Sequence, residues 1–168
     1  AAQLDPDAPM PQWGIAMAAA GDFRPMFQLG DPGERQRRPA EEPKSAAPGA
    51  RGPSGLERAR EAAAKAQQLS ANGNRLEQLY IAAVAARRDP DSKDRDGDYI
   101  RGLRQLIAEF PKEVEAKAYL ALALMNGYVL PEKTPRPGAE EAVALLQEIL
   151  KQDPDHVGAH HFVIHVLE

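Results

Sequence analysis

Proline marks the points in this chain where one helical pattern ends and the next begins. The phrases LDPDAP, EFPKEVEA and QDPDHVGA place Pro6, Pro111 and Pro154 just before apolar helical patterns. Proline has no backbone N–H to donate, and its ring clashes with the preceding helical turn. Each of these prolines therefore stops the helix before it, and the residues that follow start a new one. The chain is thus predicted to be a series of separate helices.

Aligning the three prolines brings the helices that follow them into a common register. The shared positions are apolar in every helix, and their i, i+1, i+4 spacing is typical of one buried helical stripe. We expect the following sets to face the core: Ile15, Leu120 and Val163; Ala16, Ala121 and Ile164; Ala19, Leu124 and Leu167.

The remaining apolar residues also have a helical period, and no segment alternates with period two for long enough to be a strand. Aromatic residues are only 5% of a chain that is 43% hydrophobic, so alanine and leucine, both strong helix formers, dominate its apolar content. The fold class is therefore predicted to be all-α. We expect seven helices, at about 8–22, 55–70, 74–88, 98–109, 114–128, 138–152 and 157–168.

The chain is predicted to be a single domain, residues 1–168, with a flexible insertion at about 22–54. The insertion is rich in proline, glycine and mixed charge, which is typical of a segment that cannot pack a core. A partly ordered lid is the alternative, because Phe23, Met26 and Phe27 could fold over a neighbouring groove. We also expect a fragment of a longer protein, since the first residues read as the end of a helix and the last lack a C-terminal cap.

The order helix, connector, helix and then "xDP" or "FP" resembles the tetratricopeptide repeat. The phrases that carry the resemblance are LDPDAPMPQWGIAMAAAGDF, LIAEFPKEVEAKAYLALAL and AVALLQEILKQDPDHVGA. Repeats of this kind stack because a single helix pair cannot bury its apolar face alone. The resemblance implies antiparallel helix pairs stacked as a right-handed solenoid, in which the first helix of each pair lines a concave groove.

This expected groove is mostly apolar, with a polar cluster at one end. Such a surface is the usual form of a small-ligand site, and helical repeats also hold peptides. The first hypothesis is therefore a binding module for a peptide, a protein or a small molecule. The expected groove residues are Trp13, Met17, Ala118, Leu122, Met125, Asn126, His161 and His165.

All four histidines lie within ten residues near the end of the chain. His161, His165 and Glu168 are spaced i, i+4 and i+7, so we expect them on one helical face. Two imidazoles one turn apart can bind one transition-metal ion such as zinc, iron or copper, and a carboxylate from the next turn could complete the set. His160 and His156 are further candidate ligands. The second hypothesis is therefore a metal-binding protein or a metal-dependent enzyme.

Two other interpretations of the histidines stay open, namely hydrogen bonding to an organic or peptide ligand and no specific role. Phe162 occupies the position where zinc proteases with the H-x-x-x-H spacing need a glutamate, so no such protease is implied. Because histidine titrates near neutrality, a ligand held by His161 and His165 is predicted to bind less well below about pH 6. A third hypothesis is a structural spacer within a larger assembly.

Bulk properties exclude several other classes of protein. The net charge of -4 gives no electrostatic basis for binding nucleic acid, and no apolar run approaches the roughly 20 residues of a membrane span. The chain has no cysteine, so disulfides and thiolate chemistry are excluded, while the compartment stays open between cytoplasm and periplasm.

The segment DPDSKDRDGDY, residues 89–99, contains a partial calcium-loop pattern. If Gly97 is the sixth position of an EF-hand loop, Leu103 occupies the twelfth, where the closing glutamate is required. We therefore expect an exposed acidic turn with Asp98 as the N-cap of the next helix.

Overall fold

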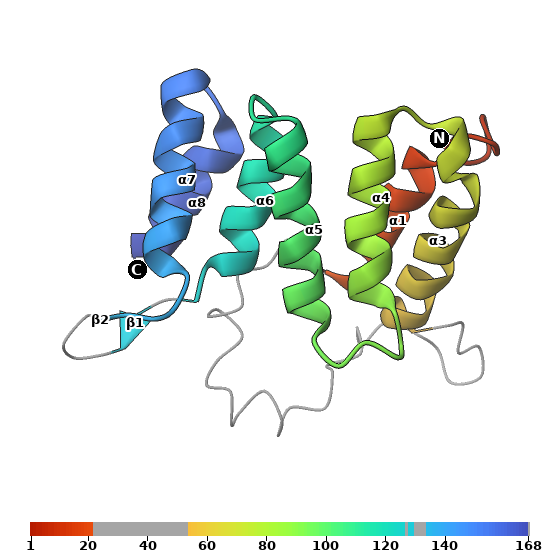
Figure 1. Ribbon diagram of the computed structural model, residues 1–168, viewed down its shortest axis with the longest axis horizontal. Helices are drawn as coiled ribbons and strands as arrows, with labels where there is room; N and C mark the ends of the chain where they lie inside the picture. The colour runs from red at the N-terminus through yellow and green to blue at the C-terminus, as the bar shows by residue number, and fades with distance from the viewer. Residues whose placement is uncertain (22–53, 127, 130–133, 168) are drawn as a thin grey trace, which may run out of the picture.

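The computed structural model describes residues 1–21, 54–126, 128–129 and 134–167, and it is almost entirely helical in these ranges (Figure 1). The predicted all-α class is confirmed for this part of the chain. The insertion predicted at about 22–54 lies outside the described residues, except for its last residue. The helices are α1 (Met10–Ala20), α3 (Gly55–Leu69), α4 (Arg75–Arg88), α5 (Arg95–Glu109), α6 (Val114–Leu124), α7 (Ala139–Gln152) and α8 (Val157–Leu167), with a 3-10 turn, η2 (Ser70–Asn72).

A short strand pair interrupts the helices between α6 and α7. Strand β1 (Tyr128–Val129) pairs antiparallel with β2 (Thr134–Pro135), with Tyr128 opposite Pro135. The helix predicted to reach residue 128 ends at Leu124 instead. Asparagine and glycine at positions 126 and 127 are poor helix formers, which favours this early end. The pair lies at the edge of the molecule and not at its centre (Figure 1).

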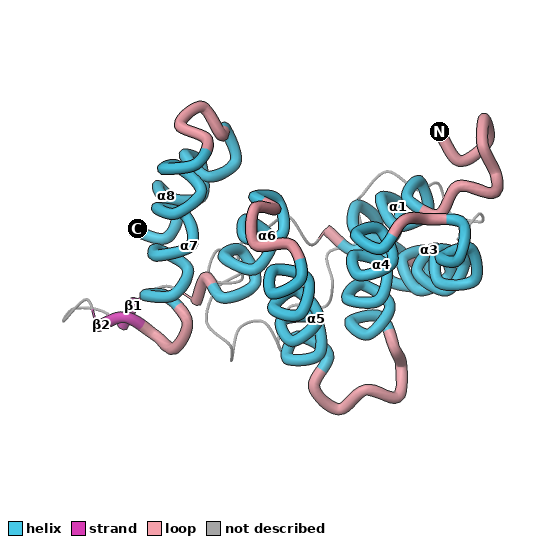
Figure 2. Tube along the Cα trace, turned by 45° about the horizontal axis from the view of Figure 1, so that its top comes forward, coloured by secondary structure: helices cyan, strands magenta, loops and turns pink. Residues whose placement is uncertain are grey.

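The helices pack mainly against their neighbours in the sequence, as a row of helical hairpins (Figures 1 and 2). Helix α1 packs on α3, α4 on α5 and α6 on α7, while α3–α4 and α5–α6 contacts join successive hairpins. Helix α1 also contacts α4, and α8 packs on α7 and contacts α6. The helices α1, α4 and α6 are thus the first members of three successive pairs.

Helices α3, α4 and α5 each begin after a residue whose side chain accepts a hydrogen bond from a free N–H group of the first turn. Ser54 and Asn74 form reciprocal capping boxes with glutamates three residues later, at the starts of α3 and α4. The Asp94 carboxylate accepts the N–H of Gly97, so Asp94 caps α5 and the helix begins at Arg95. The prediction that Asp98 caps this helix is therefore wrong, because an acidic side chain four residues earlier already satisfies these donors.

The buried stripe predicted from the proline alignment is only partly present. Leu120, Ala16 and Ala121 are buried, whereas Ile15 is 37% and Ile164 60% exposed. Helix α1 starts four residues after Pro6, while α6 starts three residues after its proline, at position 111. This offset does not decide which residues are buried, since Ile164 is exposed although α8 also starts three residues after its proline.

The side chain of Lys117 lies in the contact between α6 and α7 and is only 3% exposed. Its ammonium donates to Glu148 Oε1 at 2.7 Å, and the Glu148 side chain is 57% exposed. A buried charge is tolerated when it is paired, and leaving it unpaired is unfavourable. Removing the acceptor and removing the buried charge are therefore expected to have different effects on stability.

Removing Glu148 is expected to be more damaging than removing Lys117. Glu148→Leu leaves the buried ammonium without its acceptor and should lower the free energy of unfolding by about 1–3 kcal/mol. Lys117→Met keeps the apolar stem and removes the charge, so its effect should stay within about 1 kcal/mol. Urea unfolding followed by circular dichroism measures both. A larger loss for Lys117→Met than for Glu148→Leu would contradict this account of the pair.

Candidate functional site

Three aromatic side chains from different helices meet between successive hairpins. Trp13 (α1) lies 5.5 Å from Tyr80 (α4) and 5.9 Å from Tyr119 (α6), measured between ring centroids. The two tyrosine rings are 6.2 Å apart, and all three pairs are edge-to-face. This arrangement is favoured by the ring quadrupoles. We call these three residues the aromatic cluster, and it links the first helices of three pairs.

The aromatic cluster has a buried side and a half-exposed side. Tyr80 is buried, whereas Trp13 and Tyr119 are half-buried. The Trp13 indole nitrogen is itself buried, and it has no hydrogen-bond acceptor among the residues that the structure describes. Such an unsatisfied buried donor is uncommon in folded proteins.

Two glutamates near the start of α6 give the aromatic cluster an acidic edge. The Tyr80 hydroxyl donates to Glu113 Oε1 at 2.9 Å. Burial raises the pKa of Tyr80 well above its ordinary value, and the negative charge of Glu113 raises it further. Burial likewise raises the pKa of Tyr119, with a smaller contribution from the charge of Glu115. Both tyrosines are therefore neutral hydroxyl groups at physiological pH.

Most of the predicted groove residues lie in the packed interior. Met17 is 1%, Ala118 3%, Leu122 5% and Met125 0% exposed. Met17 packs with residues of α3, α4 and α5, while Ala118 and Met125 pack with residues of α7 and α8. These side chains stabilise contacts between helices and do not line an open surface, which corrects the expectation for these four residues.

The other predicted groove residues are at least partly accessible. Trp13 is half-buried in the aromatic cluster, and Asn126 is exposed after the end of α6. His161 is exposed and His165 half-buried, both on α8. Tyr80 and Tyr119 were not among the groove residues predicted from the sequence. The available signal was their rarity, since the chain has only one tryptophan and four tyrosines.

The four histidines have different roles in the structure. The Nε2 atoms of His161 and His165 are 3.1 Å apart, and their rings are edge-to-face with centroids separated by 4.5 Å. His160 Nε2 lies 2.7 Å from the Pro154 carbonyl oxygen, which can only accept, so this nitrogen carries the proton. We call His161 and His165 the histidine pair.

His156 caps the helix that carries the other three histidines. Its Nδ1 accepts the N–H of Ala159 at 3.1 Å, and its Nε2 is 3.4 Å from Glu115 Oε1. Glu168, predicted as a third metal ligand, lies outside the described residues. Within the described part of the chain, no three histidine, aspartate or glutamate side chains form a group that could hold a metal ion.

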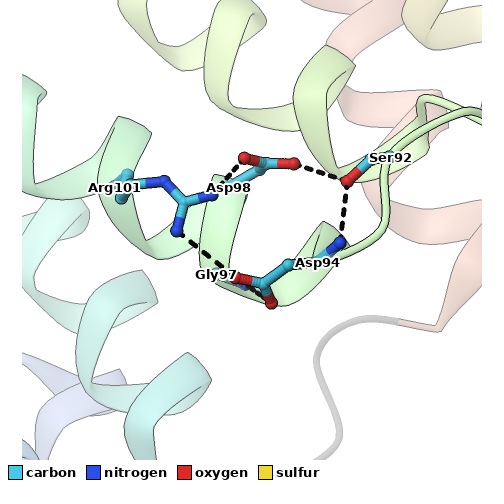
Figure 3. A network of polar contacts seen from close by, with 5 residues as sticks. All are labelled: Ser92, Asp94, Gly97, Asp98 and Arg101. Atoms are coloured by element: carbon cyan, nitrogen blue, oxygen red, sulfur yellow. Dashed lines mark hydrogen bonds and ion pairs between the residues drawn. The ribbon is translucent and has the colours of Figure 1, made fainter.

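The acidic turn at residues 89–99 is held by hydrogen bonds within the turn and by ion pairs to Arg101 of the following helix (Figure 3). Arg101 pairs with the carboxylates of Asp94 and Asp98, and the Ser92 hydroxyl donates to Asp98. Hydrogen bonds from Ser92 and Arg101 lower the pKa of Asp98. Leu103, at the position of the closing calcium ligand, is fully buried. The turn caps and braces α5, in agreement with the expected acidic turn.

A shallow cleft of about 280 Å³ lies between α1 and α3. Pockets for small molecules usually have volumes of ~300–1,000 Å³ and enclose most of their ligand. The cleft is slightly smaller than this range, and charged side chains form much of its lining. It therefore does not support a small-molecule site. Its lining residues are Gln12, Ile15, Arg58, Glu61, Ala62 and Lys65.

Comparison with family models, curated proteins and solved structures found no match to this chain. Its function must therefore be argued from its own geometry. None of the described helices combines the length and the apolar content that crossing a lipid bilayer requires.

Proposed function

We propose that this chain is a helical-repeat binding module that holds a peptide segment of a partner protein at the aromatic cluster. The segment would carry an arginine or lysine side chain. The proposal keeps the tetratricopeptide-like arrangement, in which the first helices of successive pairs form the binding face. The observation that carries it is the convergence of half-exposed Trp13 and Tyr119 from two of these helices.

The chemistry of the aromatic cluster favours a cationic side chain. Arginine and lysine bind the faces of tryptophan and tyrosine through cation–π attraction, which contributes ~0.5–2 kcal/mol. Glu115 is exposed at the start of α6 and is close enough to Tyr119 for its charge to raise the tyrosine pKa. Glu113 adds a second carboxylate beside Tyr80. Aromatic faces beside carboxylates match a guanidinium or ammonium group.

The indole N–H of Trp13, which has no acceptor in the described part of the chain, supports a peptide as the ligand. Trp13 Nε1 is a buried donor, and an extended peptide supplies backbone carbonyl acceptors along its length. A small rearrangement of the half-buried ring would allow one such carbonyl to accept this hydrogen. Binding would then replace an unfavourable buried group with a hydrogen bond.

Trp13 is the only tryptophan of the chain, so its fluorescence reports directly on the aromatic cluster. The probes are two ten-residue peptide libraries without tryptophan, one with arginine fixed at alternate positions and the other with glutamate there. We expect the arginine library to change Trp13 emission and the glutamate library to leave it unchanged. Peptides recovered from the arginine library should bind Tyr119→Ala at least about tenfold more weakly, as expected when one aromatic face is lost.

A matched control is Tyr128→Ala, which removes a half-buried tyrosine on the peripheral strand β1. It should bind the recovered peptides like the wild type, and circular dichroism should show both variants folded. The proposal fails if neither library perturbs Trp13 emission. It also fails if Tyr119→Ala and Tyr128→Ala bind the recovered peptides equally well.

A further inference from the structure

The histidine pair lies on α8 with its two ring nitrogens facing each other. His161 and His165 are one helical turn apart, and their Nε2 atoms are separated by 3.1 Å. In the absence of an ion, one Nε2 can donate a proton to the lone pair of the other. Both nitrogens are therefore directed toward the same small volume beside the helix. His161 is exposed, so this volume is accessible from solvent.

The geometry points to a chelating site for a late divalent transition-metal ion, with Zn²⁺ as the first choice, at the histidine pair. Zinc binds imidazole nitrogen at ~2.0–2.1 Å, and two nitrogens on a tetrahedral ion are then about 3.3 Å apart. The separation of 3.1 Å is already close to this value. An ion would replace the shared proton and leave the helix backbone unchanged. This inference is independent of the proposed peptide site.

His160 and His156 use ring nitrogens to bond backbone groups, whereas His161 and His165 direct their Nε2 atoms toward each other. His160 uses Nε2 to bond the Pro154 carbonyl, and His156 uses Nδ1 to cap α8. Engaging either nitrogen in metal binding would break a contact that holds the start of the helix. Zinc binding at the histidine pair would replace the hydrogen bond between its two Nε2 atoms and would leave both of these backbone contacts in place.

The pair supplies two protein ligands, which makes this an open site. No group of three potential ligand side chains occurs among the described residues. The remaining coordination positions are thus available to water or to a donor from another molecule, unlike those of a closed structural zinc site. Imidazole ligands favour Zn²⁺, Ni²⁺ and Cu²⁺ over Mg²⁺ and Ca²⁺, which prefer oxygen. We expect the same selectivity here.

The test uses the untagged full chain and ZnCl₂ in isothermal titration calorimetry, with MgCl₂ as the comparison ion. One zinc site should appear, and Mg²⁺ should give no binding heat. His161→Ala and His165→Ala should each weaken zinc binding at least about tenfold, because even outer-shell substitutions in metal sites have effects of 10–100-fold. His160→Ala is the matched control on the same helix and should change the affinity less than about twofold.

A second readout separates ligation from folding. Nuclear magnetic resonance of the imidazole nitrogens should show zinc-dependent shifts at Nε2 of His161 and His165, and none at the His160 ring. Circular dichroism should show α8 and the other helices intact in all variants. Retention of the zinc site in the double variant His161→Ala/His165→Ala would overturn the inference. Equal losses in His160→Ala and His161→Ala, or no zinc binding to the wild type, would do so as well.

Discussion

Gly102→Val is expected to lower the free energy of unfolding by about 3 kcal/mol, the upper part of the range for overpacking a tight contact. A Cβ added at Gly102 would lie 2.8 Å from Ala83 Cβ and 2.9 Å from Ala83 Cα. One of these atoms belongs to the backbone of α4, so the clash cannot be relieved by rotating a side chain. Helices α4 and α5 would have to separate, which would weaken the contacts that Leu103 and Val84 make in the same core.

Gly102→Ala tests the same contact with a smaller group. Alanine is a better helix former than glycine by ~1 kcal/mol, and this gain opposes the clash. We expect a net loss of about 1 kcal/mol, because the backbone contact remains too short. Urea unfolding followed by circular dichroism measures both variants, and an unchanged m-value would show that the denatured state is unaffected.

Gly14 provides the control for these substitutions. It lies inside α1, and an added Cβ would have no neighbour within 4 Å. Gly14→Ala should therefore stabilise the protein by up to about 1 kcal/mol through helix propensity alone. If Gly102→Ala stabilises the chain as much as Gly14→Ala does, the close approach of α4 and α5 is not a constraint.

Trp13→Ala is expected to lower the free energy of unfolding by about 3 kcal/mol. Truncating a buried tryptophan usually costs ~3–5 kcal/mol, and the half-buried position of Trp13 places it at the lower end. The loss includes two edge-to-face ring contacts and the packing of α1 against α4 and α6. Chemical unfolding followed by circular dichroism is the appropriate measurement, since the variant has no tryptophan fluorescence.

Trp13→Phe separates ring packing from the indole N–H. Phenylalanine keeps an aromatic ring and removes the unsatisfied buried donor, so the loss should stay below about 1.5 kcal/mol. A double-mutant cycle between Trp13→Ala and Tyr119→Ala should give a coupling energy of about 0.5–1.5 kcal/mol, as for other aromatic pairs. Additive effects of the two substitutions would show that the rings contribute independently.

The helices could be predicted from the sequence because their boundary signals are local. Ser54 and Asn74 each precede a glutamate by three residues, and α3 begins at Gly55 as predicted. The start of α5 was placed three residues late because the turn offers several acidic side chains. Local sequence does not show that Asp94 is the cap while Asp98 pairs with Arg101.

The orientation of the helices was harder to predict. Helices α1 and α6 consist mostly of apolar residues on all sides, so their pattern defines no clear buried face. Lys117 would be expected in solvent from its charge alone, yet it is buried against α7. Ala118 was expected to line the same groove as Trp13, but the next residue, Tyr119, is the one that contacts Trp13. The misplacement of Ala118 corresponds to a rotation of α6 by a single residue.

The sequence predicts the residues of the histidine pair better than those of the aromatic cluster. The histidine pair depends on an i, i+4 spacing within one helix, which the sequence contains in full. The aromatic cluster depends on residues 13, 80 and 119 being brought together by the packing of three helices. A single sequence contains no direct record of such distant contacts. Scarce aromatic residues are therefore useful candidates even without a spacing pattern.

The row of hairpins has a consequence for how the chain acquires and loses its structure. Since most helix contacts join consecutive helices, they link residues that are close in sequence. Such local topology lowers the loop-closure entropy of the folding transition state and favours rapid folding. Because each unit is stabilised mainly by its neighbours, unfolding is also less cooperative along the row. We therefore expect amide hydrogen exchange to be faster in α8, which packs mainly on α7, than in the α4–α5 hairpin, which contacts helices on both sides.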